Sequence, residues 1–147
     1  MSELSDLYQE IILDHNKRPR NFRALPDCLC SAEGHNPLCG DEVKVFVQVD
    51  EGKLSDVAFE GQGCAISRAS ASLMTLKTMG QTVERARELS GTVREMLLGP
   101  EADPPALLGD LVALSGVRKF PARIKCAMLP WRTLEAALDG RAAATTE

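Results

Sequence analysis

The hydrophobic pattern of this chain changes its period at Gly61-Gln62-Gly63. Before this point, valine occupies every second position from 43 to 49, and a second short run at 54–60 follows a turn at 50–53. This alternation predicts an antiparallel hairpin with one buried face. After it, apolar residues recur at helical spacing from Cys64 to about Met79, and Gly80 ends the pattern. The chain is therefore expected to pass directly from a small sheet into a helix.

Further elements are predicted on both sides of this junction. An amphipathic helix is expected over residues 4–15, and a short strand at about 28–32 would add a third strand to the sheet. Helical spacing also predicts helices at about 82–98 and 125–138, separated by a stiff connector, a short helix at 107–114 and a loop at 116–121. Residues 141–147 are expected to form a disordered tail.

The composition narrows the class of protein. A length of 147 residues is typical of one domain, which needs no disulfides to bury a core. No signal peptide and no apolar run of about 20 residues is visible, so neither secretion nor a membrane span is predicted, and a reducing cytoplasm is expected. The net charge of −4 and the few aromatic residues argue against a nucleic-acid binder.

Three of the five cysteines lie in settings that favour a thiolate or a turn. Cys64 is expected at the first turn of a helix, where backbone N–H groups and the helix dipole stabilise an anion. Cys126 is expected in the same setting at the start of the last helix, close to Arg123 and Lys125. Cys39 belongs to a loop before a strand, and Asp41 follows two residues later. Each position alone is also typical of an ordinary turn or a small buried cysteine.

The three cysteines are far apart in sequence, so only the fold can bring them together. If they converge, three thiolates and the Asp41 carboxylate suit Zn²⁺, and an iron–sulfur cluster could use the same thiolates. His35, near Cys39, is a weaker candidate ligand or acid–base group, whereas His15 is expected to cap a helix end. Cys28 and Cys30 are interpreted as cysteines without a chemical role on a short strand, one buried and one exposed. The basic segment 17–23 is interpreted as a solvated stretch that could steer an acidic partner surface.

Four sequence blocks follow one another along the chain. They are Leu7-Tyr8 through Ile12 with Asp14-His15 and Pro19-Arg20-Asn21; Asn36-Pro37-Leu38-Cys39-Gly40-Asp41; Phe59-Glu60-Gly61-Gln62-Gly63-Cys64-Ala65-Ile66-Ser67 with Ala69-Ser70-Ala71-Ser72-Leu73-Met74; and Phe120-Pro121-Ala122-Arg123-Ile124-Lys125-Cys126-Ala127. Together they resemble the SufU branch of the IscU-like family, which shares the NifU N-terminal domain. Lys125 stands where IscU-type scaffolds carry a histidine, and residues 96–119 correspond to a SufU-type insertion. Both features favour the SufU branch.

The resemblance implies a single α+β domain over residues 1–147, with a small antiparallel three-stranded sheet, helices on one face and a metal site at one end. It implies zinc held by Cys39, Asp41, Cys64 and Cys126. It also implies a PLP-dependent cysteine desulfurase of the SUF type (SufS) as partner and a downstream SUF scaffold as recipient. Cys39 would accept persulfide sulfur by an exchange of the thiol–disulfide kind, and Arg123 would orient the partner or the free thiolate.

Two other functions stay open at this point. The same ligands could assemble a [2Fe–2S] cluster or bind iron, which would make the chain a scaffold rather than a sulfurtransferase; the lysine at position 125 argues against this. A purely structural zinc domain that binds a protein partner is the third possibility.

Overall fold

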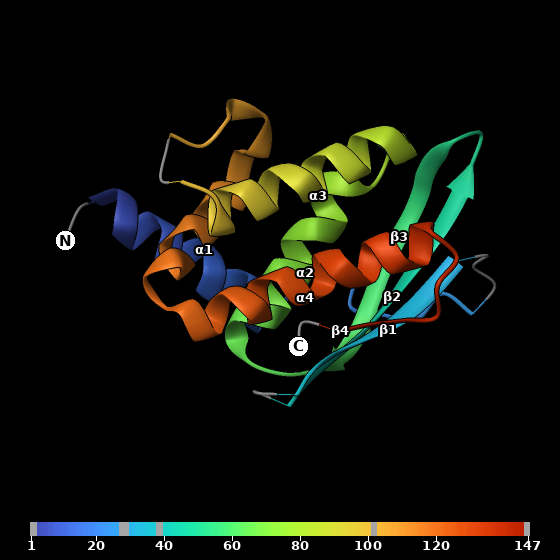
Figure 1. The fold of residues 1–147 in the computed structure, drawn as a ribbon, viewed down its shortest axis with the longest axis horizontal. Helices are drawn as coiled ribbons and strands as arrows, with labels where there is room; N and C mark the ends of the chain where they lie inside the picture. The colour runs from blue at the N-terminus through green and yellow to red at the C-terminus, as the bar shows by residue number, and fades with distance from the viewer. Residues whose placement is uncertain (1–2, 27–29, 38–39, 101–102, 146–147) are drawn as a thin grey trace.

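The computed structural model describes residues 3–26, 30–37, 40–100 and 103–145. A sheet lies on one side of the molecule and the helices cover one of its faces, which confirms the predicted α+β fold (Figure 1). The elements, in chain order, are α1 (Glu3–Lys17), β1 (Cys30–Asn36), β2 (Asp41–Asp50), β3 (Lys53–Gln62), α2 (Ala65–Thr78), α3 (Val83–Leu98), the 3₁₀ segment η1 (Ala106–Lys119), α4 (Pro121–Leu138) and β4 (Ala143–Thr145).

The sheet has four strands in the order β3-β2-β1-β4, so the prediction of three strands was wrong. The fourth strand is β4, which pairs in parallel with β1, aligning Glu33 with Ala143 and His35 with Thr145. Residues 143–145 are therefore not the disordered tail that the sequence predicted, while residues 146–147 lie outside the described residues. Three small residues carry no periodic signal, and their pairing partner is more than a hundred positions away, which is why sequence patterning missed this strand.

The hairpin of β2 and β3 is confirmed. Glu51 and Gly52 form its turn, and both have positive φ angles, 52° and 77°, as the favoured two-residue hairpin turns require. Val43, Val45 and Val47 alternate toward the core, as predicted. β1 spans Cys30–Asn36, so it continues past the predicted end at residue 32, and it pairs antiparallel with β2. Residues 28 and 29 of the predicted strand lie outside the described residues.

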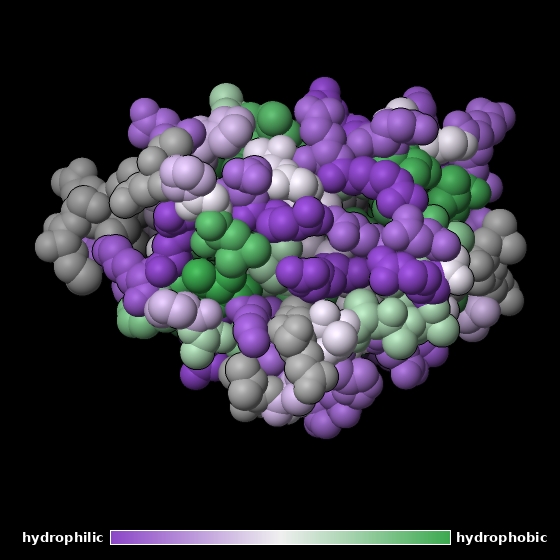
Figure 2. Space-filling model, in the orientation of Figure 1, coloured by the Kyte–Doolittle hydropathy of each residue, from purple (hydrophilic) through white to green (hydrophobic). Residues whose placement is uncertain are grey.

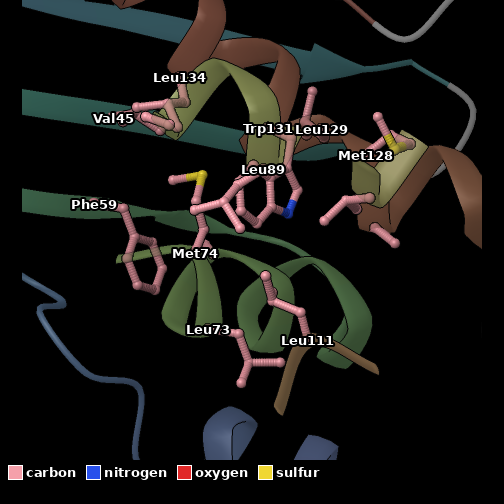
Figure 3. Packing of buried hydrophobic residues seen from close by; sticks show 14 of the residues in the cluster. Val45, Phe59, Leu73, Met74, Leu89, Leu111, Met128, Leu129, Trp131 and Leu134 are labelled. Atoms are coloured by element: carbon pink, nitrogen blue, oxygen red, sulfur yellow. The ribbon is translucent and has the colours of Figure 1, made fainter. Parts of the chain in front are cut away.

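α4 and α2 pack directly on the sheet, α4 over β1 and β2 and α2 against β3. Gly34 of β1 makes the α4 contact possible, because a Cβ at this position would collide with the Oγ1 atom of Thr133. The centre of the core is Trp131, which is fully buried among side chains from α2, α3, α4 and η1 (Figure 3). α2 can pack close to the neighbouring elements because its buried face consists largely of small residues: Ser67, Ala69, Ser70, Ala71 and Ser72.

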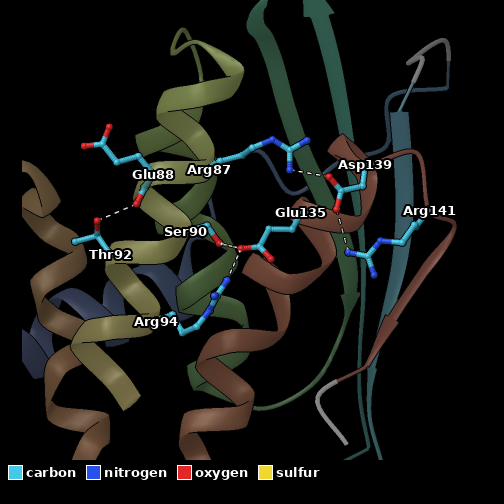
Figure 4. Close-up of polar contacts among 8 residues, drawn as sticks. All are labelled: Arg87, Glu88, Ser90, Thr92, Arg94, Glu135, Asp139 and Arg141. Atoms are coloured by element: carbon cyan, nitrogen blue, oxygen red, sulfur yellow. Dashed lines mark hydrogen bonds and ion pairs between the residues drawn. The ribbon is translucent and has the colours of Figure 1, made fainter. Parts of the chain in front are cut away.

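Two ionic clusters join α3 to α4 and to the segment before β4 (Figure 4). Glu135 of α4 accepts hydrogen bonds from Ser90 Oγ at 2.5 Å and from Arg94 Nη2 at 2.9 Å. Asp139, which caps α4, accepts from Arg87 at 2.6 Å and from Arg141 at 3.2 Å. The Arg87 hydrogen bond lowers the pKa of the Asp139 carboxyl below its ordinary value. These contacts fix the direction in which the chain leaves α4 toward β4.

The segment between α3 and α4 departs from the prediction. In place of a short helix and a loop, η1 extends from Ala106 to Lys119, with a kink at Gly109, where φ is 53°. α4 begins at Pro121, four residues before the predicted start at Lys125, because a proline is favoured in the first turn of a helix. This earlier start changes the position of Cys126 within its helix.

No helix among the described residues is long and apolar enough to cross a membrane. The face over α3 and α4 is mostly hydrophilic, with separate apolar clusters (Figure 2). The large apolar side chains that are exposed come from several elements: Leu7, Leu13, Phe22, Leu76, Leu98 and Phe120.

Candidate metal centre

Three side chains that could bind a metal meet at the end of the sheet where β2 begins and α2 starts. They are Asp41, Cys64 and Cys126, and their ligand atoms all lie within 4.8 Å of one another. Asp41 and Cys126 are 1% and 0% exposed, whereas Cys64 is partly exposed. The site is therefore buried on one side and open on the other.

Asp41 and Cys64 are held together by the glycine-rich junction between β3 and α2. The backbone N–H of Cys64 donates to Asp41 Oδ1 at 2.9 Å, and the Cys64 sulfur lies 3.9 Å from Asp41 Oδ2. Gly61 has a φ of 144° and lies directly against the backbone of Glu42. A Cβ on Gly63 would lie 2.6 Å from Asp41 Oδ1. Both glycines are needed because the junction passes so close to the start of β2.

The two described cysteines occupy different helical positions. Cys64 is the N-cap of α2, and its sulfur accepts the backbone N–H of Ser67 at 3.5 Å. This agrees with the expected stabilisation of an anion at a helix N-terminus. Cys126 is the sixth residue of α4 and not part of its first turn, so the prediction of the same setting was wrong. Instead, its buried sulfur lies 3.5 Å from Nδ2 of Asn36.

Cys39 lies outside the described residues, but both ends of its loop are described. Asn36 and Asp41 are cross-strand partners, and the Gly40 N–H donates to the Asn36 carbonyl at 2.9 Å. Gly40 has a φ of 71°, which suits glycine in a tight turn. Cys39 is two residues from Asp41, so covalent geometry keeps their Cα atoms within about 7 Å of each other.

The other sequence candidates do not belong to this group of three ligands. Arg123 is exposed in the first turn of α4, and Lys125 is half-buried. His35 is half-exposed on β1, between β2 and β4, with Nδ1 3.7 Å from Glu42 Oε1. Cys30 is a half-buried free cysteine at the opposite end of β1, and Cys28 lies outside the described residues. Sequence reasoning missed Asn36, although its place three residues before Cys39 marked it as part of the same loop.

The described donors fit a zinc ion. Tetrahedral zinc, with bonds of about 2.0–2.3 Å, places its ligand atoms roughly 3.4–3.8 Å apart. The described group, within 4.8 Å, needs only a small contraction to reach this spacing. Two sulfurs and one carboxylate leave one position for a fourth ligand, and soft thiolates with a single carboxylate suit Zn²⁺ better than Mg²⁺ or Ca²⁺.

Comparison with known proteins shows the family. The family model described as the NifU-like N-terminal domain matches residues 7–127. The chain belongs to this family. It is 45% identical to the zinc-dependent sulfurtransferase SufU of Bacillus subtilis, over 91% of this chain and 90% of that protein. It is 41% identical to the iron–sulfur cluster assembly scaffold protein IscU of Streptococcus pyogenes, over 94% of this chain and 86% of that protein.

Solved structures of this NifU-like family have the same fold. The crystal structure of FiSufU from Fervidobacterium islandicum, described as a candidate scaffold protein for the SUF system, superposes with a TM-score of 0.84 at 38% identity, covering 94% of this chain and 99% of that one. A NifU-like N-terminal protein from Brucella abortus gives a TM-score of 0.83 at 25% identity, over 94% and 96% of the two chains. The assignment of residues 96–119 as a branch-specific insertion stays a prediction.

A Gly63→Ala substitution is expected to weaken zinc binding by roughly tenfold or more, the size typical of disturbing a ligand's supporting contacts. The new Cβ would displace the Asp41 carboxylate, only 2.6 Å away, and break its hydrogen bond with the Cys64 N–H. Competition with a chromophoric chelator would measure the affinity. Gly91→Ala is the matched control, because its Cβ would have no neighbour within 4 Å. Equal zinc affinity of the Gly63→Ala variant and the wild type would contradict the role given to this junction.

His15 predicts a pH dependence of stability. It is buried, and its Nδ1 lies 2.7 Å from the Ser72 hydroxyl, which also accepts the Arg20 N–H at 2.8 Å. Since that oxygen accepts from Arg20, its hydrogen is available to the neutral imidazole. Burial, followed by the charge of Arg20, lowers the pKa of His15 from 6.5, while Asp14 and Asp110 oppose this more weakly.

As the pH falls, His15 therefore takes up its proton at a higher pH in the unfolded chain than in the folded chain. The contribution of His15 to the free energy of unfolding is fully present above about pH 6.5, the pKa in the unfolded chain. It declines as the pH falls from 6.5 toward the lower pKa of the folded chain. Urea unfolding of the metal-free protein at about pH 7.5 and about pH 5.5 would measure the decline. His15→Asn, which keeps an acceptor for Ser72 but does not titrate, should show a smaller decline. Equal declines in the two proteins would rule out this contribution.

Proposed function

We propose that this chain is a zinc-dependent sulfur-transfer protein that accepts persulfide sulfur on Cys39 for iron–sulfur cluster assembly. The observation that carries the proposal is the meeting of Asp41, Cys64 and Cys126 at the base of the loop that contains Cys39. A relative with 45% identity bears the name zinc-dependent sulfurtransferase, which supports this function over a scaffold.

Asp41, Cys64 and Cys126 would hold the zinc, with Cys39 as the fourth ligand. Bound zinc would keep its cysteine ligands deprotonated and ordered near neutral pH. The burial of Asp41 and Cys126 suits them to remain in place. Cys39 differs because it belongs to a short loop between two strands, and we assign it the role of acceptor on that basis.

The donor would be a PLP-dependent cysteine desulfurase of the SUF type, whose active-site cysteine carries a persulfide. The Cys39 thiolate attacks the terminal sulfur of that persulfide. A new sulfur–sulfur bond forms on Cys39, the old one breaks, and the desulfurase cysteine leaves as a thiolate. This exchange needs no added oxidant or reductant, and the product is a Cys39 persulfide for a downstream SUF scaffold.

Arg123 would favour the approach of this donor. It is exposed in the first turn of α4, three residues before Cys126, and its positive charge would attract an anionic sulfur group. We assign the exchange to the cytoplasm, where thiols stay reduced between transfers.

The test is alanine production by the SUF-type desulfurase, at limiting reductant, with and without the zinc-loaded protein. We expect a many-fold stimulation by the zinc-loaded protein and little by protein treated with a chelator. Mass spectrometry of the product would locate the added sulfur atom. Absence of stimulation, together with uptake of iron and sulfide by the chain itself, would instead favour a [2Fe–2S] scaffold; the streptococcal relative is named an iron–sulfur cluster assembly scaffold protein.

A further inference from the structure

Asn36 is a buried polar side chain in contact with the metal centre. It is the last residue of β1 and is 1% exposed. Its Nδ2 atom lies 3.5 Å from the sulfur of Cys126, and its Oδ1 has no hydrogen-bond partner among the described residues. A buried amide with one unsatisfied end is costly, so its retention at this position calls for a compensating role.

The chemistry of the sulfur decides which end of the amide faces it. A thiolate that binds a metal accepts hydrogen bonds and has no hydrogen to donate. The NH₂ group must therefore point toward Cys126 and the oxygen away from it. This is the orientation in the structure, and it leaves Oδ1 directed away from the sulfur and without a partner among the described residues.

The backbone of Asn36 is fixed on both sides. Its cross-strand partner in the sheet is Asp41, itself a candidate ligand, and its carbonyl accepts the Gly40 N–H at 2.9 Å. Two residues earlier, Gly34 lets α4 pack tightly against β1. The amide is thus held by the same two strands that present Asp41 and the Cys39 loop, while the sulfur comes from α4.

We propose that Asn36 is a positioning residue of the metal centre: its amide donates to the Cys126 sulfur and holds that sulfur, from α4, in register with Asp41 on the sheet. The inference rests on the zinc site proposed above and adds a residue that binds no metal itself. Partners of this kind, in contact with a ligand, commonly contribute about 10- to 100-fold to metal affinity.

Two variants test the role. Asn36→Leu keeps the same branched arrangement of heavy atoms without a hydrogen-bond donor, and Asn36→Ala serves if the bulkier leucine prevents folding, as judged by circular dichroism. We expect either variant to bind zinc about 10- to 100-fold more weakly in competition with a chromophoric chelator. In cobalt-loaded protein, the sulfur-to-cobalt charge-transfer band should move to lower energy, because the hydrogen bond that stabilises the sulfur lone pair is gone.

Ser70→Ala is the matched control. Ser70 is fully buried and donates to the carbonyl of Ala127, next to Cys126, at 2.6 Å, so its loss weakens the same region without removing a contact to sulfur. It should lower stability and leave the cobalt band unchanged. Wild-type zinc affinity and an unshifted band in the Asn36 variants would overturn this inference alone. Failure of the wild-type protein to bind zinc would overturn the metal centre, and the inference with it.

Discussion

A Cys39→Ala variant, loaded with zinc, is expected to lose all stimulation of the desulfurase, leaving the rate of alanine production by the desulfurase alone. Alanine has no sulfur with which to attack the partner's persulfide, and the remaining candidate thiols are less suited to the task. Cys126 is fully buried, and the Cys64 sulfur already accepts a backbone N–H. The measurement is the alanine assay described above, with added mass on the protein as a second readout.

The zinc content of this variant decides how the result is interpreted. Asp41, Cys64 and Cys126 stay in place, so the variant should still bind zinc when zinc is supplied in excess. A variant that holds zinc, binds the desulfurase and accepts no sulfur would exclude a purely structural zinc domain. Retained stimulation, or an added sulfur atom on Cys64 or Cys126 of the wild-type protein, would show that the acceptor was assigned incorrectly.

A Cys126→Ala variant is expected to lose nearly all of the stabilisation that zinc confers. A ligand at a thousand times its dissociation constant stabilises a folded protein by about 4 kcal/mol. For a chain of this length, that corresponds to a rise in the unfolding temperature of roughly 8–16 °C. Removing a buried sulfur ligand should reduce this rise to a small fraction of its wild-type value. Thermal unfolding of the variant and the wild type, with and without added zinc, would measure the rise.

Cys30→Ala provides the matched control for this experiment. Cys30 is a free, half-buried cysteine on β1, at the end of the strand far from Asn36 and outside the cluster of three ligands. Its alanine variant should keep the full zinc-dependent rise in the unfolding temperature. An equal loss in both variants would indicate that zinc binds at a site different from the one proposed.

The elements near the site were predictable because their apolar residues recur at the spacing of a strand or of a helix. Valines at every second position determined β2, and the glycines of residues 61–63 marked the passage from β3 to α2. These local signals placed Asp41 and Cys64 correctly at element boundaries. Cys126 was placed one turn too early, because the sequence reading began the last helix at Lys125 although Pro121 can occupy its first turn.

The convergence of these residues was not visible in local patterns. Cys126 reaches the sheet because α4 packs on β1 through Gly34, a contact between residues about a hundred positions apart. The four-block resemblance supplied the ligand set instead, and the structure brings three of its four members together. Neither the local patterns nor the family resemblance predicted the contact between Asn36 and Cys126, because an asparagine in a turn sequence is ordinarily interpreted as a turn former.

The parallel pairing of β4 with β1 has a practical consequence for anyone preparing this protein. Thr145 aligns with His35, the neighbour of Asn36, so whatever is attached after it emerges beside the loop that contains Cys39, the proposed sulfur acceptor. α1, in contrast, begins at the end of the molecule remote from the sheet (Figure 1). An affinity tag or fluorophore placed before α1 is therefore expected to lie farther from the proposed docking side. The same group at the other terminus would obstruct it, and an inactive preparation could then be mistaken for an inactive protein.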